Sequence, residues 1–221
     1  MGDLRRTRIS MVRQEIQYIA EQETISNVVG LLKACALKKN LYEGIKIHTQ
    51  IRNKGLLEKS PHVRSSLINM YAKCNAVDQA KEIMDELLVR DTASWNALIS
   101  GLAQFGNSEE VIETLEAMQN EGISPDIVTF ISSLRAFTIV EDLEKGQELH
   151  KYIVVVGFDK DVVIGNTLVS LYAKCGAFID AQYVLNGKLF QDEISWTALI
   201  TGYVDCGMGD EALRCYEKMQ L

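Results

Sequence analysis

Apolar residues recur with a helical period in residues 166–181, which read NTLVSLYAKCGAFIDA. Their spacing of i, i+3, i+4 and i+7 places them on one face of a helix. These residues are Leu168, Leu171, Tyr172 and Cys175. Gly176 follows them, and a glycine at this point commonly ends a helix in the left-handed conformation. A second helix is predicted over about residues 179–189, so the pattern indicates two helices joined by a short turn.

The same pattern occurs twice, 101 residues apart. Residues 65–80 read SSLINMYAKCNAVDQA and match residues 166–181, while SWNALI at 94–99 returns as SWTALI at 195–200. Repetition at this scale is typical of an array of supersecondary units, each of which packs on its neighbours. We therefore expect an all-α fold, an α-solenoid of helix-turn-helix units in a single domain over residues 1–221.

Aligning the helix pairs divides the chain into units. Four units share a leucine at the seventh position: 61–91, 92–126, 162–192 and 193–221. Two others carry a glycine and a histidine four residues apart, Gly44 with His48 in 25–60 and Gly146 with His150 in 127–161. Residues 1–24 fit only as a degenerate unit, and the last unit stops within its second helix. The chain is therefore expected to be part of a longer array.

Composition excludes several classes of function. The net charge of −7 argues against coating nucleic acid through a basic surface, but it leaves binding in a locally shaped groove open. The five cysteines include no C-x-x-C pair, which favours buried packing residues in a reducing compartment over disulfides. No apolar run approaches the ~18 residues that a membrane span needs, so no membrane association is expected.

At this point the chain resembles a plant-type pentatricopeptide repeat (PPR) protein of the PLS subclass, in which long (L), short (S) and ordinary (P) repeats alternate. The S-type signature is present as NTLVSLYAKCG at 166–176, and the P-type signature as SWNALISG at 94–101 with GISPD at 122–126. The resemblance covers about residues 25–221. It implies a right-handed superhelix, with L-type units 25–60 and 127–161, S-type units 61–91 and 162–192, P-type unit 92–126 and a truncated P-type unit 193–221.

The resemblance also implies binding of single-stranded organellar RNA, with one base read per repeat. The reading residues would be the fifth and the last residue of each P or S unit: Ser65 with Asp91, Asn96 with Asp126, Asn166 with Asp192, and Thr197 without a partner. By the family pattern, Asn with Asp favours uracil, Ser with Asp favours guanine, and Thr favours a purine. The L-type units carry Val29 and Ile131 at the fifth position, and these side chains cannot hydrogen-bond, so the L-type units are expected to read no specific base. The implied RNA core is therefore 5′-G-U-n-U-purine-3′, in which n is the base at the 127–161 unit.

The second residue of each reading unit would sandwich the base. These residues are His62, Ala93, Val163 and Ile194. A simpler interpretation of the polar residues is also open, since Asn and Asp near a helix start are common N-caps. Capping and base recognition are compatible roles for the same side chain.

No catalytic arrangement is evident. A zinc deaminase needs H-x-E and C-x-x-C, and neither pattern occurs. We therefore expect a specificity factor for C-to-U editing or RNA maturation in a mitochondrion or chloroplast, with no enzymatic activity, metal or cofactor of its own. Editing-complex proteins are possible partners, and a deaminase could be supplied in trans or in cis beyond Leu221. The alternative from another class is a protein-binding helical scaffold of the tetratricopeptide type.

Overall fold

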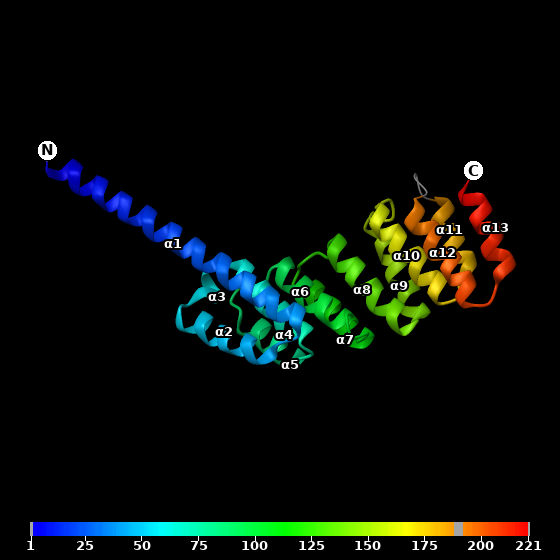
Figure 1. Cartoon of the computed structure of the whole chain (residues 1–221), viewed down its shortest axis with the longest axis horizontal. Coiled ribbons are helices and arrows are strands. Elements are labelled where there is room, and N and C mark those ends of the chain that lie inside the picture. Colours follow the sequence, from blue (N-terminus) through cyan, green and yellow to red (C-terminus); the bar gives the residue numbers. More distant parts are fainter. Residues whose placement is uncertain (1, 188–191, 221) are drawn as a thin grey trace. The chain divides into compact units, whose positions relative to one another are not determined.

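The computed structural model describes residues 2–187 and 192–220, and for residues 2–18 it describes the backbone alone. Within these residues the chain is helical throughout (Figure 1), and no strand occurs in them. The helices are α1 Gly2–Lys38, α2 Leu41–Asn53, α3 Leu56–Lys59, α4 Pro61–Lys73, α5 Val77–Glu86, α6 Thr92–Ala103, α7 Ser108–Asn120, α8 Ile127–Val140, α9 Leu143–Val155, α10 Val162–Lys174, α11 Phe178–Gly187, α12 Glu193–Asp205 and α13 Gly209–Met219.

The chain folds as two compact units, residues 1–97 and residues 98–221, divided within α6. In the first unit, α1 packs on α4, and each of these helices packs on the helix that follows its turn, α2 or α5. In the second unit, α10 lies between α8 and α12, and α9, α11 and α13 are the second helices of their pairs (Figure 1). The predicted all-α, helix-turn-helix architecture is confirmed.

Left-handed residues make the turns between paired helices. Gly176 has φ +70° and Gly207 has φ +73°, and Asn75 takes the same place in its unit with φ +60°. Glycine meets no steric penalty there, and asparagine is among the few other residues that tolerate this conformation. The substitution of Asn75 for the usual glycine therefore preserves the turn. This confirms the turn predicted at Gly176.

Helix starts follow the expected unit boundaries at residues 61, 92, 127, 162 and 193. At the N-terminus, however, α1 runs without a break through the boundary drawn between residues 24 and 25. The second helix predicted over 179–189 is α11, Phe178–Gly187, and residues 188 and 189 lie outside the described residues. The assignment of L, S and P units stays a prediction.

The Gly-x-x-x-His pattern lies where the second helix of one pair packs against the first helix of the next pair. Gly44 in α2 faces Met70 in α4, and a Cβ on this glycine would collide with the Met70 sulfur. Gly146 in α9 faces Leu171 in α10 in the same way. In both units the absence of a side chain lets the two helices approach closely, as core packing at near-crystalline density requires.

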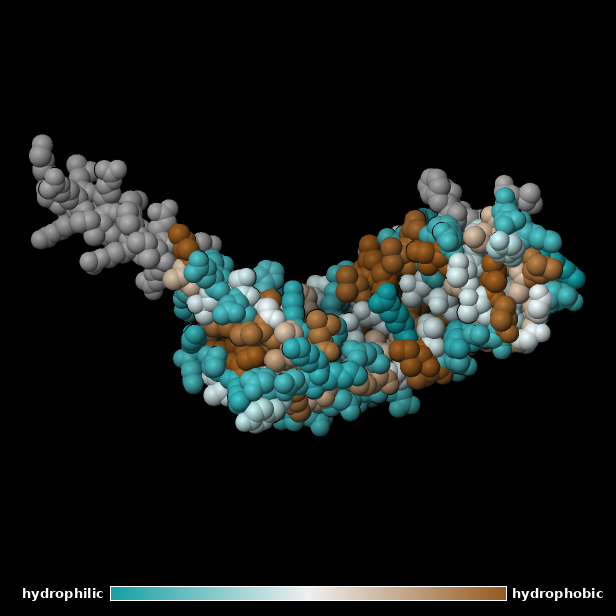
Figure 2. All heavy atoms as spheres, viewed as in Figure 1, coloured by the Kyte–Doolittle hydropathy of each residue, from teal (hydrophilic) through white to brown (hydrophobic). Residues whose placement is uncertain are grey.

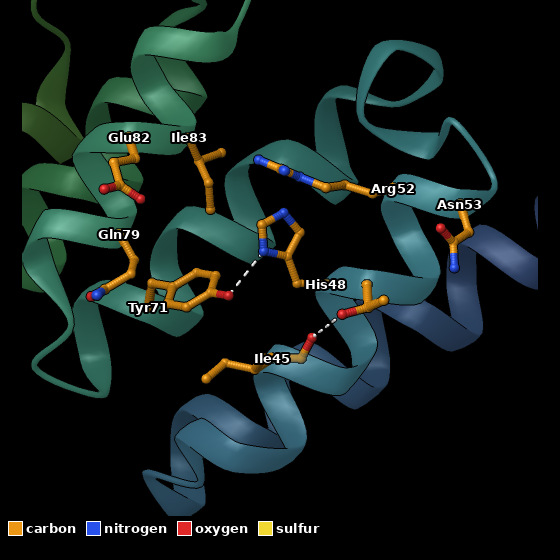
Figure 3. A pocket seen from close by; sticks show the side chains of 9 residues that line it. Ile45, His48, Arg52, Asn53, Tyr71, Gln79, Glu82 and Ile83 are labelled. Carbon is orange, nitrogen blue, oxygen red and sulfur yellow. Dashed lines mark hydrogen bonds between the residues drawn. The ribbon is translucent and has the colours of Figure 1, made fainter.

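The histidine of this pattern joins the same two helices by a hydrogen bond. His48 Nδ1 lies 2.9 Å from the Tyr71 hydroxyl (Figure 3), and His150 Nδ1 lies 2.8 Å from the Tyr172 hydroxyl. Burial, reinforced at His48 by Arg52, lowers the pKa of both histidines, which favours the neutral ring. Burial also raises the pKa of Tyr172 to about 12. The pairs therefore connect neutral groups, and they explain why Gly, His and Tyr recur together.

A pH dependence of stability follows from these histidines. In the folded protein their pKa lies below the value of about 6.5 that they have in the unfolded chain. As the pH falls through about 6.5, the unfolded chain takes up protons before the folded protein does, so the free energy of unfolding should decrease. Above this pH the contribution of the neutral histidines to stability is complete. Urea denaturation at a series of pH values between 7.5 and 5.5 measures this. A His48→Gln/His150→Gln variant should lose the slope; an identical slope in the variant would contradict the assignment.

In the described part of the chain, no helix has both the length and the apolar character needed to cross a membrane. Likewise, no group of three or more His, Cys, Asp or Glu side chains in the described residues is arranged to hold a metal ion.

Candidate nucleic-acid interface

Asn166, Asp192 and Ser195 form a polar cluster where α10 meets the start of α12. The Asn166 amide donates from Nδ2 to Asp192 Oδ2 at 2.6 Å. The other oxygen, Asp192 Oδ1, accepts from the backbone N–H of Ser195 at 2.9 Å and so caps α12. The Ser195 hydroxyl lies 2.5 Å from Asn166 Oδ1 and 2.7 Å from Asp192 Oδ1, and its single proton can go to either. The structure thus brings together the predicted reading pair of the 162–192 unit.

Asn166 is not a helix cap, whereas its partner Asp192 is. Asp161 caps α10 by accepting from the backbone N–H groups of Val163 and Ile164, both at 2.9 Å. Asn166 lies farther along the helix, so the alternative that Asn166 is an N-cap is wrong. The capping interpretation is confirmed for the aspartates, because Asp91, Asp126 and Asp192 each accept from the backbone of the helix that follows.

Two exposed aliphatic side chains flank the cluster along the chain. Hydrophobic residues reach the surface in several patches of the 98–221 unit (brown in Figure 2). Val163 is 51% exposed and precedes Asn166 by three residues on the same helix face. Ile194, between Asp192 and Ser195 in the sequence, is 66% exposed, whereas Asn166 is only 9% exposed. A recessed hydrogen-bonding group beside exposed aliphatic carbons suits a flat ligand with a polar edge.

The corresponding residues of the 61–91 unit are arranged differently. Asp91 again caps the next helix, accepting from the Ser94 backbone N–H at 2.8 Å and from the Ser94 hydroxyl at 2.7 Å. Ser65, however, donates to the carbonyl of His62 in its own helix, at 3.4 Å. The contact to Asp91 Oδ2 comes from Arg64 Nη2, at 3.5 Å. Arg64 was not among the residues predicted from the sequence, although it is a charged residue where the equivalent unit has Gly165.

The remaining predicted residues occupy helix starts as well. Asn96 in α6 is 9% exposed. Asp126 forms a capping box with Thr129, accepting from its backbone N–H at 2.9 Å. Thr197 in α12 is exposed, as are the sandwiching candidates His62 and Ala93.

First helices alone line a hollow in the second unit. This hollow, between α8, α10 and α12, has a volume of about 460 Å³. Ser170, Lys174 and Thr201 contribute polar groups to it. Lys174 Nζ lies 3.8 Å from a Glu141 oxygen and 3.7 Å from an Asp205 oxygen, so acidic residues flank this cation on both sides.

These features define the chain as an all-helical repeat protein with polar residues gathered at the starts of its first helices. The repeats are pentatricopeptide repeats: the PPR repeat family matches residues 90–138, and the PPR repeat matches residues 63–91 and 194–221. The chain is 33% identical to a chloroplastic pentatricopeptide repeat-containing protein of Arabidopsis thaliana over 209 residues, which are 92% of this chain and 25% of that protein. A mitochondrial pentatricopeptide repeat-containing protein of the same plant is 32% identical over 200 residues, 90% of this chain and 19% of its own length.

Solved structures agree on the fold. The pentatricopeptide repeat protein PPR10 from maize superposes with a TM-score of 0.67 at 20% identity, over 87% of this chain and 29% of that one. PPR10 in complex with an 18-nt psaJ RNA element superposes with a TM-score of 0.66 at 18% identity, over 80% of this chain and 27% of that one. Nuclear proteinaceous RNase P 2 from Arabidopsis thaliana superposes with a TM-score of 0.59 at 16% identity, over 80% of this chain and 41% of that one. The chain spans only about a fifth to a quarter of the length of the two curated relatives.

Proposed function

We propose that this chain binds single-stranded RNA in a sequence-specific way, with one base read by each P or S unit. The observation that carries the proposal is the hydrogen bond between the buried Asn166 and Asp192, with the exposed Val163 one turn before Asn166 and the exposed Ile194 two residues after Asp192. Unstacked bases present their Watson–Crick edges to such side chains, and aliphatic or aromatic groups can cover their faces. PPR10, which shares the fold, is described in complex with an RNA element, and this supports the proposal.

The cluster fixes how the Asn166 amide would meet a base. The amino group points to Asp192 and the carbonyl oxygen to Ser195, so both ends of the amide are held before any ligand binds. Preorganisation of this kind reduces the entropy lost on binding. An amide carries donors and an acceptor, which complements the mixed edge of uracil. The proposed reading residues are Ser65, Asp91, Asn96, Asp126, Asn166, Asp192 and Thr197, and the proposed RNA core remains 5′-G-U-n-U-purine-3′.

The proposal also includes the compartment and the RNA process in which the chain acts. Curated relatives are described as chloroplastic or mitochondrial, which supports a role in one of these organelles. The alternation of L, S and P units supports membership of the PLS subclass and service as a specificity factor in C-to-U editing or RNA maturation, with the chemistry done by a partner. The tetratricopeptide-type scaffold is not favoured, because the matched repeats are pentatricopeptide repeats.

A salt titration of RNA affinity tests the binding mode. Lys73 and Lys174 occupy equivalent positions in the last turns of α4 and α10 and are the cations that we expect to contact phosphates. Two phosphate contacts on a single strand give a slope of log affinity against log salt of about −1.4. We expect a slope this shallow because a chain with a net charge of −7 has few cations available to contact phosphates. Filter binding at several salt concentrations measures it.

Selection of RNA from a random pool is the direct test of sequence specificity. The pool should be enriched in the proposed core. A pool that shows no enrichment, or a binding curve with a steep slope and no preference among sequences, would contradict the proposed function.

A further inference from the structure

Arg64 is a buried cation beside the proposed reading residues of the 61–91 unit. Only 8% of its surface is exposed. Its Nη1 donates to the Leu57 carbonyl at 3.3 Å, and its Nη2 lies 3.5 Å from Asp91 Oδ2. Burying a guanidinium is costly unless a carboxylate partners it. In the described residues Asp91 is the carboxylate within ion-pair distance of it.

The equivalent unit shows what Arg64 changes. Asp91 and Asp192 both use Oδ1 to cap the next helix. The second oxygen of Asp192 accepts from Asn166, the fifth residue of its unit, at 2.6 Å. The second oxygen of Asp91 is engaged by the fourth residue of its unit, Arg64, a position that Gly165 occupies in the other unit. The last residue therefore has a different partner in each S-type unit.

The charge state of Asp91 keeps this ion pair intact at neutral pH. Partial burial by itself would raise the pKa of Asp91, but hydrogen bonds from Ser94 and the nearby Arg64 outweigh it and hold the pKa below its usual range. Asp91 is thus a carboxylate whose second oxygen already faces a guanidinium.

We propose that Arg64 is a specificity-determining residue of the 61–91 unit: by engaging Asp91 it weakens the preference for guanine that Ser65 and Asp91 would otherwise confer. This inference rests on the proposed function. Guanine presents N–H donors on its Watson–Crick edge, and a carboxylate oxygen is the acceptor that suits them. A guanidinium at that oxygen competes for it and places its own donors beside those of the base. The first base of the core is therefore read less strictly than the Ser–Asp pair alone predicts.

A double-mutant cycle tests whether Arg64 acts through Asp91. Dissociation constants are measured for four RNAs that carry A, C, G or U at the first base of the core, with unstructured flanks. The proteins are the unmodified chain, Arg64→Met, Asp91→Asn and the double variant. Methionine keeps a long apolar stem without the charge. We expect Arg64→Met to raise the preference for guanine about tenfold or more, the scale of a hydrogen bond to a charged group, and to change nothing in the Asp91→Asn background.

The base that faces Asn166 is the internal control, because its preference should be the same in all four proteins. Thermal melts establish that each variant is folded, and Arg64→Gln, which also removes the charge but keeps a polar end group, replaces Arg64→Met if the latter is unfolded. A wild-type base profile in the folded variant, or an equal change of affinity for all four RNAs, overturns the inference. Failure of the unmodified chain to prefer any base of the core overturns the proposed function instead.

Discussion

Replacing Asn166 with threonine should move the RNA preference of this protein at one base, from uracil to a purine. The amide of Asn166 is held by Asp192 and Ser195, and threonine removes its amino group and its carbonyl oxygen while keeping a hydroxyl. A mismatched polar edge in a recessed site costs about 1–3 kcal/mol, which corresponds to a change in relative affinity of about 5-fold to 150-fold. Selection from a random RNA pool, followed by dissociation constants for uracil and purine variants of the core, measures the effect.

The matched control is Asn186→Thr, the same chemical change in α11 at an exposed residue outside the proposed reading positions. Its RNA preference should equal that of the unmodified protein. The reading role of Asn166 would be refuted by an unchanged pool for Asn166→Thr, or by an equal shift in both variants. The parallel substitution Asn96→Thr should alter the second base of the core in the same way.

Gly202→Val should destabilise the 98–221 unit by about 1–3 kcal/mol, the usual cost of overpacking a well-packed core. A Cβ on Gly202 in α12 would lie 2.8 Å from both the Cβ and the backbone oxygen of Ala173 in α10. A backbone oxygen cannot move aside as a flexible side chain can, so α12 itself would have to shift. Chemical denaturation monitored by circular dichroism gives the free energy of unfolding.

Gly30→Val is the control for helix propensity, because a Cβ on Gly30 in α1 would meet no atom within 4 Å. Glycine and valine are both poor helix formers and differ by less than about 0.5 kcal/mol, so this variant should be nearly neutral. Similar losses at residues 30 and 202 would mean that the close approach of α12 to α10 is not the cause.

Much of the fold is readable from local patterns. The period of apolar residues located the helices of the repeated block, and Gly176 marked a turn that the structure has at φ +70°. The aspartates before α6, α8 and α12 could be identified as caps because capping needs only residues three apart. The Gly-x-x-x-His pattern was visible as well, but its meaning was not, since Tyr71 lies 23 residues from His48.

The sequence by itself determined the helix-pair repeat, its register and the candidates for reading RNA, because helix periodicity, turns and caps depend on neighbours along the chain. Only the tertiary structure decided how those candidates are partnered. Asn166 meets Asp192 across 26 residues, whereas Asp91 meets Arg64 across 27 and Ser65 turns back to its own helix. Such choices depend on how two packed helices bring side chains within hydrogen-bond range, and on the need of a buried guanidinium for a carboxylate. Two units with the same signature therefore have different polar sites.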